Sequence, residues 1–145
     1  MVFKGHNYAI DRVRTINQER FITACQDGSV NLWNIRKTKP VFKCQDAHGK
    51  GWIAAMDNIK QSNIFATAGI DRSVKIWGIE EDNRGIELLQ ELPVKGIVTD
   101  MKLTREWLAV TECDELRLGR WVTDKCRNKI KIFPRVGAGN QVNVE

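Results

Sequence analysis

Hydrophobic and polar residues alternate in short runs along most of the chain, and no long run has the spacing of an amphipathic helix. In residues 29–33 and 73–77, SVNLW and SVKIW, apolar side chains fall on every second residue and each run ends at a tryptophan. A period of two places alternate side chains on opposite faces of an extended strand. The turn sequences DG and DR directly precede these runs. Each run is therefore predicted to be the second arm of a hairpin.

The same segment recurs at a fixed interval. TACQDGSVNLW ends at Trp33, TAGIDRSVKIW ends at Trp77, and a fainter copy, TECDELRLGRW, ends at Trp121, so that successive tryptophans are 44 residues apart. The threonine that begins each copy, up to Thr111 in the third, keeps this spacing. Repeats of roughly 40 to 45 residues with short strands are typical of propeller blades.

Each repeat contains four runs with strand character. RFITAC, IFATAG and WLAVTEC are expected to pair with the tryptophan runs, and YAIDRVRTI, WIAAMDNI and IVTDMKL to form the first strands. KPVFKCQ, IELLQELP and NKIKIFP are expected to form the fourth, outer strands. We therefore predict an all-β fold of about three four-stranded antiparallel β-propeller blades, an incomplete propeller. The blades are expected at roughly residues 5–45, 46–93 and 94–135, with a flexible tail at 136–145.

The repeats resemble those of the WD40 family, in which a histidine, a hydroxyl, an aspartate and a tryptophan form one hydrogen-bonded chain in each blade. Each buried indole, hydroxyl and imidazole needs a partner, so a complete chain locks the turn onto the sheet. The resemblance implies two such structural tetrads: His6, Thr23, Asp27 and Trp33, and then His48, Thr67, Asp71 and Trp77.

The third repeat departs from this pattern. It lacks the histidine, and Glu115 stands where the other repeats have aspartate. Arg120 falls where the other repeats have an aliphatic residue on the face expected to be buried. A guanidinium there needs an acidic partner, for which Glu115, Asp114 and Glu112 are the candidates, unless this face meets something other than a standard blade.

Composition sets the class of protein. The 145 residues are 42% apolar and 28% charged, which is typical of one soluble globular domain. No apolar stretch has the length of a signal peptide or of a membrane span, so we expect an intracellular protein. The four cysteines include no C-x-x-C pair, so neither a disulfide framework nor a zinc site of four thiolates is indicated.

No residue pattern indicates catalysis. Cys44 and His48 have the spacing of half a zinc site, but no second pair of ligands follows, and both histidines sit where the repeat places a structural one. The glycines of RVGAGNQ lack the third glycine and the helix of a phosphate loop. We therefore predict no enzymatic activity, no metal and no cofactor.

The net charge of +5 is unevenly distributed. Basic residues gather in RKTK, residues 36–39, and in KCRNKIKIFPR, residues 125–135, where two lysines alternate with isoleucines and so share one face of a strand. The favoured interpretation is a solubilising surface whose lysines protect a sheet edge. The alternative is a surface that contacts RNA phosphates or a partner. In that alternative, the candidate residues for contact with RNA or a partner are Arg36, Lys37, Lys39, Lys125, Arg127, Lys129, Lys131 and Arg135.

Several segments, above all LRLGRW followed by a basic strand and IFPR, are similar to the WD-repeat proteins of the U3 small nucleolar ribonucleoprotein (snoRNP). This resemblance implies a non-catalytic nucleolar scaffold that binds U3 snoRNA and the core snoRNP proteins and supports pre-rRNA processing in small-subunit biogenesis. The alternative is a WD40 adaptor for protein–protein interaction through the propeller faces. Neither function involves a membrane.

The family's propellers have seven blades, whereas this sequence predicts three. Three blades cannot close a ring, and an open arc exposes two faces that are otherwise buried. We therefore expect either that the chain is a fragment of a longer protein or that copies associate to complete a ring.

Overall fold

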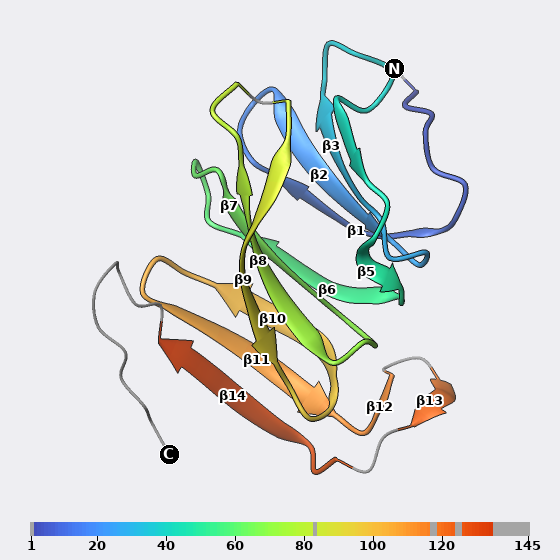
Figure 1. The fold of residues 1–145 in the computed structure, drawn as a ribbon, viewed down its shortest axis with the longest axis vertical. Coiled ribbons are helices and arrows are strands. Elements are labelled where there is room, and N and C mark those ends of the chain that lie inside the picture. Colours follow the sequence, from blue (N-terminus) through green and yellow to red (C-terminus); the bar gives the residue numbers. More distant parts are fainter. Residues whose placement is uncertain (1, 83, 117–118, 124–125, 135–145) are drawn as a thin grey trace.

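The structure, a computed structural model, describes residues 2–82, 84–116, 119–123 and 126–134. Within these ranges the regular secondary structure consists of β-strands (Figure 1). No helix in this part of the chain is long and apolar enough to cross a membrane. The expected all-β fold is confirmed.

Three antiparallel sheets, here called blades 1 to 3, follow one another along the molecule (Figure 1). Blade 1 contains, in spatial order, β1 (Ile10–Thr15), β2 (Arg20–Cys25), β3 (Val30–Asn34) and β4 (Phe42–Cys44). The short β5 (Ala47–Lys50) lies in the connection to the next sheet. Blade 2 contains β6 (Ile53–Asn58), β7 (Ile64–Gly69), β8 (Ser73–Ile79) and β9 (Ile86–Pro93).

Blade 3 has a different construction. Its described strands are β10 (Ile97–Leu103), β11 (Trp107–Cys113) and β14 (Lys129–Pro134), in that order. Between β11 and β14, β12 (Glu115–Leu116) and β13 (Gly119–Thr123) pair only with each other, as a separate hairpin. NKIKIFP is thus the third strand and not the fourth, and LRLGRW is not a blade strand. Both of those expectations were wrong.

Strand pairing identifies the residue that replaces the third tryptophan. Phe65 lies opposite Trp77 in blade 2, and Leu108 lies opposite Phe133 in blade 3. Phe133 therefore takes the place that the sequence repeat assigned to Trp121. The segment KIKIF of β14 is the counterpart of SVKIW in β8.

The threonine position shifts in the same way. Val110 lies opposite Lys131 as Thr67 lies opposite Lys75, so Val110, and not Thr111, is the counterpart of the tetrad threonine. The interval of 44 residues is misleading here because the turn before β11 is shorter than the turn before β7. Blade 3 consequently has no hydroxyl at the tetrad position.

The expectation of an arginine on the buried blade face was also wrong. Arg120 belongs to β13, outside the blade, and its side chain is not among the described residues. Ile132, opposite Ala109, is the counterpart of Ile76, opposite Ala66. The blade face therefore carries an aliphatic residue in all three sheets.

Apolar clusters hold successive sheets together. Leu32 of β3 and Phe65 of β7 belong to the cluster between blades 1 and 2. Ile76 of β8 and Leu108 of β11 belong to the cluster between blades 2 and 3. Because side chains alternate along each strand, one blade contributes one face to each cluster.

A buried carboxylate joins the three inner strands. Asp57 of β6 accepts the backbone N–H of Leu103 at 2.9 Å and lies 3.1 Å from Nζ of Lys102, both on β10. Its other oxygen lies 3.5 Å from Nε of Arg14 on β1. Burial alone would raise the pKa of Asp57, but the bonds from Leu103 and Lys102 outweigh burial and hold the pKa below its ordinary value.

Close contact between the β2–β3 turn and β5 predicts the effect of two glycine substitutions. Gly28 has a φ of 79°, and a Cβ there would overlap the carbonyl oxygen of Gly49. Gly49 has a φ of 58° but open space around its own Cβ direction. Gly49→Ala should cost about 1 kcal/mol, the strain of a positive φ alone. Gly28→Ala should cost clearly more, because β5 must also move. Urea denaturation measures both, and equal costs would contradict the close contact.

Candidate nucleic-acid interface

The tetrad of blade 2 is complete. Nδ1 of His48 lies 2.8 Å from a carboxylate oxygen of Asp71, and Nε2 of His48 lies 2.7 Å from the hydroxyl of Thr67. Nε1–H of Trp77 donates to the same hydroxyl oxygen at 2.7 Å. The imidazole can thus donate to the carboxylate and accept from the threonine, which gives both imidazole nitrogens, the hydroxyl and the indole N–H of the tetrad a partner. The chain of bonds fixes the β7–β8 turn onto the sheet.

The carboxylate of that tetrad is held ionised. Burial would raise the pKa of Asp71, but hydrogen bonds from His48 and Ser73 outweigh burial and lower the pKa below its ordinary value. A depressed folded-state pKa means that this carboxylate stabilises the fold above the pKa of the unfolded chain. That contribution is lost as the pH falls through the folded-state pKa.

The tetrad of blade 1 lacks its aspartate link. The hydroxyl of Thr23 lies 2.8 Å from Nε2 of His6 and accepts Nε1–H of Trp33 at 2.8 Å. Asp27, however, accepts the hydroxyl of Ser29 at 2.6 Å and does not bond to the histidine. Three of the four expected members therefore form one chain.

Neutral groups replace the aspartate at His6. Its Nδ1 lies 3.0 Å from the amide nitrogen of Asn31 and 2.8 Å from Sγ of Cys25. Burial lowers the pKa of His6 and raises the pKa of Cys25 to about 11. The thiol and the imidazole are therefore both uncharged at neutral pH, and Nδ1 is the acceptor.

No metal centre is formed by the residues that the structure describes. They contain no group of three or more His, Cys, Asp or Glu side chains able to hold a metal ion, and all four cysteines are free. The nitrogens of His48 are both used by the tetrad. Cys44 and His48 thus do not form half of a zinc site.

The first basic cluster lies in the loop between β3 and β4. Arg36 is paired with Glu19. Lys37 and Lys39 are exposed, and no acidic side chain in the described part of the chain forms an ion pair with either. Two of the three cations predicted here are therefore available to an anionic ligand.

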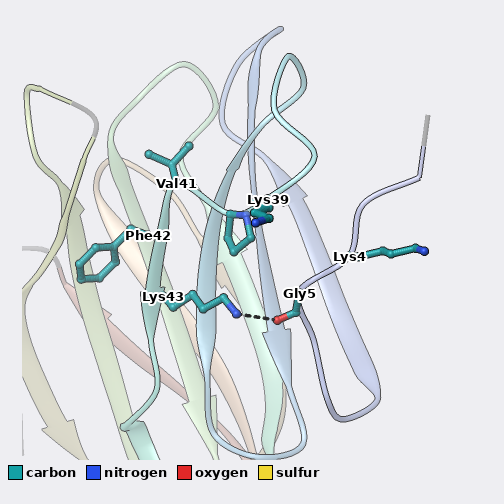
Figure 2. Close-up of a pocket in the computed structure, with 7 residues that line it drawn as sticks. Lys4, Gly5, Lys39, Val41, Phe42 and Lys43 are labelled. Carbon is teal, nitrogen blue, oxygen red and sulfur yellow. Dashed lines mark hydrogen bonds between the residues drawn. The ribbon is translucent and has the colours of Figure 1, made fainter.

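The same side of blade 1 has a hollow of about 440 Å³ between β4 and the N-terminal segment (Figure 2). Lys43 reaches across it, and its Nζ donates to the carbonyl oxygen of Gly5 at 3.0 Å, while Lys4 points away from the sheet (Figure 2). No carboxylate lines the hollow. The lining residues are Lys4, Gly5, Lys39, Pro40, Val41, Phe42 and Lys43.

Sequence reasoning missed Lys4 and Lys43. The signal that could have found them is the tripeptide VFK, which occurs at residues 2–4 and again at 41–43. Phe3 packs against Trp33 and Lys43 donates to Gly5, so both copies of the tripeptide lie at blade 1.

The second basic cluster contains a buried acid. Lys129 and Lys131 share one face of β14, as the alternation predicted, and both face Glu112, whose side chain is 0% exposed. Nζ of Lys129 lies 3.1 Å from Oε2 and Nζ of Lys131 lies 3.7 Å from Oε1 of Glu112. Lys131 also lies over the ring of Phe133, at 4.8 Å. The carboxylate therefore compensates part of the positive charge.

The two basic clusters are not brought together. The β3–β4 loop belongs to blade 1 and β14 to blade 3, at opposite ends of the row of sheets (Figure 1). Arg127 is exposed. Lys125 and Arg135 lie outside the described residues.

Comparison with protein families accounts for the repeated sheets. The model for the WD domain, G-beta repeat, matches residues 1–34 and 38–78, just over half of the chain. The chain belongs to the WD40 family. The resemblance found in the sequence is thus confirmed, and the sheets are WD40 blades.

Individual relatives show which WD40 proteins this chain is similar to. U3 small nucleolar RNA-interacting protein 2 of Homo sapiens is 32% identical over 92% of this chain and 31% of the relative. Ribosomal RNA-processing protein 9 of Saccharomyces cerevisiae is 28% identical over 88% of this chain and 29% of the relative. The chain therefore spans about a third of the length of these WD40 relatives.

Solved structures agree with this assignment. The structure of U3-55K and the crystal structure of the RRP9 WD40 repeats each match with a TM-score of 0.87 and 30% identity. Each match covers 92% of this chain and 44% of the solved one. The similarity to WD-repeat proteins of the U3 particle therefore extends over nearly the whole chain.

The different tetrads predict unequal effects of one substitution. Asp71→Ala removes the carboxylate from His48, whereas Asp27→Ala removes only turn bonds to Ser29. Hydrogen bonds to charged groups contribute about 1.5–3 kcal/mol, so Asp71→Ala should be the costlier change by an amount of that order. Denaturant unfolding at pH 7 measures the difference, which should shrink below pH 4 as Asp71 is protonated. Equal costs at pH 7 would show that the His48 bond contributes nothing.

The buried acid predicts that a surface lysine is structural. Lys129→Ala leaves the more distant Lys131 as the ion-pair partner of Glu112 among the described residues and should lower the free energy of unfolding by about 1–3 kcal/mol. The double variant Lys129→Ala/Glu112→Gln should recover part of this loss, because no buried charge remains. Lys37→Ala, which breaks no ion pair, is the control and should change stability by less than about 0.5 kcal/mol. Thermal or urea unfolding measures all three.

Proposed function

We propose that this chain is a non-catalytic, RNA-associated scaffold of the U3 snoRNP type that supports pre-rRNA processing in the nucleolus. The observation that carries the proposal is the similarity, over 92% of the chain, to proteins named for interaction with U3 small nucleolar RNA. U3 snoRNA and the core proteins of the particle are the proposed partners. The chain would hold them in position by contact and without chemistry.

Charge distribution supports an RNA-facing surface on blade 1. Lys4, Lys37 and Lys39 have no ion pair among the described residues, and Lys43 bonds only a backbone carbonyl. We call these four residues the lysine rim. Ammonium groups make strong, charge-assisted bonds to phosphate oxygens, and each contact releases counterions from the RNA. The lysines of β14 are less available, because Glu112 already attracts both.

Salt dependence of RNA binding tests this surface. Lys37→Gln/Lys39→Gln should weaken binding to U3 snoRNA and lower the slope of log affinity against log salt by about 1 to 2, since each lost phosphate contact removes about 0.7–0.9. The matched control is Lys95→Gln, an exposed lysine in the β9–β10 connection, at the other end of the strands. Fluorescence anisotropy over a range of salt concentrations gives both slopes.

The outcomes separate the two candidate functions. A steep salt slope that falls in the double variant and not in Lys95→Gln supports the scaffold. An unchanged slope in the double variant would exclude Lys37 and Lys39 as RNA contacts. No binding of the wild-type chain to U3 snoRNA at low salt would favour the protein-binding adaptor instead.

A further inference from the structure

The outer strand of blade 2 exposes two leucines at a sheet edge. Blade 2 lies between blades 1 and 3 and packs against both (Figure 1), yet Leu88 and Leu89 of β9 are 47% and 50% exposed. In blade 1 the outer strand β4 has three residues, and its Phe42 packs against the cluster shared with blade 2. β9 has eight residues. It therefore presents apolar surface that the packing between blades 1, 2 and 3 does not use.

A bulge places the two leucines on different sides of the sheet. Trp77 lies opposite Leu88 and Ile76 lies opposite Gln90, so Leu89 is an extra residue in β9. A Cβ on Gly78 would lie 3.3 Å from Cδ1 of Leu89, so Leu89 leans over the backbone of β8. Leu88 shares the face of Trp77, toward blade 1. A strand laid along β9 can therefore contact one leucine on each side.

The free edge of β9 also offers backbone groups. The N–H of Glu80 donates to the carbonyl oxygen of Gly85 at 3.1 Å. Bonded pairs recur at every second residue of an antiparallel ladder, so Gly78 and Glu87 form the next pair, and the N–H and C=O of Leu88 point away from β8. No strand in the described part of the chain pairs with this edge. Such an edge is a template for another strand.

The same count from the other end of β9 places a second outward residue. The N–H of Val94 donates to the carbonyl oxygen of Arg72 at 3.0 Å, so Val74 and Leu92 form the next bonded pair. The N–H and C=O of Glu91 then point outward. Pro93 has no N–H and ends the usable edge.

Acidic side chains flank the leucines. Glu87 and Glu91 on β9 are exposed, and the ion pairs of the described residues include neither. Lys75, opposite Glu91, donates to the carbonyl oxygen of Ala47. Residues 80–93 contain one basic residue, Arg84, and five acidic residues: Glu80, Glu81, Asp82, Glu87 and Glu91. In a chain with a net charge of +5, this edge is therefore locally negative. It repels a second copy of itself and attracts a basic strand.

We propose that the edge of β9 binds an extended, basic segment of a partner protein, which adds a fifth strand to blade 2. The backbone of the segment pairs with Leu88 and Glu91, its apolar side chains contact Leu88 and Leu89, and its lysine or arginine side chains meet Glu87 and Glu91. Strand addition of this kind takes affinity from main-chain bonds and specificity from alternate side chains. The surface is separate from the lysine rim on blade 1, so its test does not depend on RNA binding.

Fluorescence anisotropy with labelled peptides tests the requirement for charge and for an extended strand. The probe is the end-blocked peptide KVKVKVKV, titrated with the full chain, and it should bind saturably. KVKPPKVK keeps the four lysines but cannot form a ladder across its two prolines, and EVEVEVEV reverses the charge. Both should bind at least about tenfold more weakly. Absence of binding by KVKVKVKV, or equal binding of either control peptide, would overturn the proposal.

Hydrogen exchange measured by NMR distinguishes strand addition from attraction between charges alone. The amides of Leu88 and Glu91 face solvent in the free chain and should exchange quickly. Bound KVKVKVKV should slow both by at least about tenfold, because each amide then donates to the peptide. The amide of Leu108, in the middle of blade 3, is the internal control and should not change. Binding that leaves the Leu88 amide unprotected would contradict strand addition.

Neutral variants test the acidic flanks. Glu87→Gln/Glu91→Gln should weaken the binding of KVKVKVKV about three- to tenfold, because two attractive charges are lost. Asp46→Asn/Glu106→Gln is the matched control, since it neutralises two exposed acids in the β4–β5 connection and the β10–β11 turn. Its affinity should stay within about twofold of wild type. Equal affinities of the two double variants would rule out the acidic flanks as the attraction.

A proline on β9 tests the free edge itself. Leu88→Pro removes an N–H that points away from β8, and Glu87 before it already has the extended backbone that precedes proline. Binding of KVKVKVKV should fall by at least about tenfold. Circular dichroism verifies that the variant keeps its strands. If it does not, Leu88→Ser/Leu89→Ser removes the apolar contacts without a change to the backbone and should weaken binding severalfold. Unchanged binding in whichever variant is folded would also overturn the proposal.

Discussion

Contact between successive sheets is the constraint on which the whole molecule depends. A blade has apolar side chains on both faces, so each face that packs against a neighbouring blade adds to its stability. Leu32 and Ile76 show this in adjacent blades, each buried in the cluster shared with the next sheet. The tetrad of blade 2 holds the β7–β8 turn onto its sheet, and Asp57 joins the inner strands of all three blades. Polar bonds thus orient the sheets, and apolar packing holds them.

Blades 1 and 2 could be predicted from sequence because their signals are local. Alternating side chains, a tight turn and a buried tryptophan all lie within a dozen residues, and strand register follows from them. Blade 3 could not, because its third strand is separated from its second by residues 114–128. A fixed interval then selects Trp121, whereas the ladder pairs Leu108 with Phe133. The similarity of KIKIF to SVKIW was present but lay outside the expected spacing.

The sequence identified most basic residues of the candidate site. It did not show which of them form ion pairs with acidic residues. A count of cations identifies Arg36 and Lys129, but not that Glu19 and Glu112 pair with them. Such pairs join residues that are distant in sequence and depend on which side chains the fold buries. A buried carboxylate strongly favours nearby ammonium groups, so basic residues beside it are less available to a ligand. The hollow at Lys4 arises in the same way, from two segments that only the fold brings together.

The β12–β13 hairpin shows that a blade can carry an addition without loss of its ladder. Glu112 at the end of β11 pairs directly with Lys129 at the start of β14, so residues 114–128 leave and re-enter the sheet at one point. The length and sequence of this excursion are therefore decoupled from strand register. The blade strands and residues 114–128 can therefore change independently in sequence. New side chains in residues 114–128 leave the packing between sheets intact.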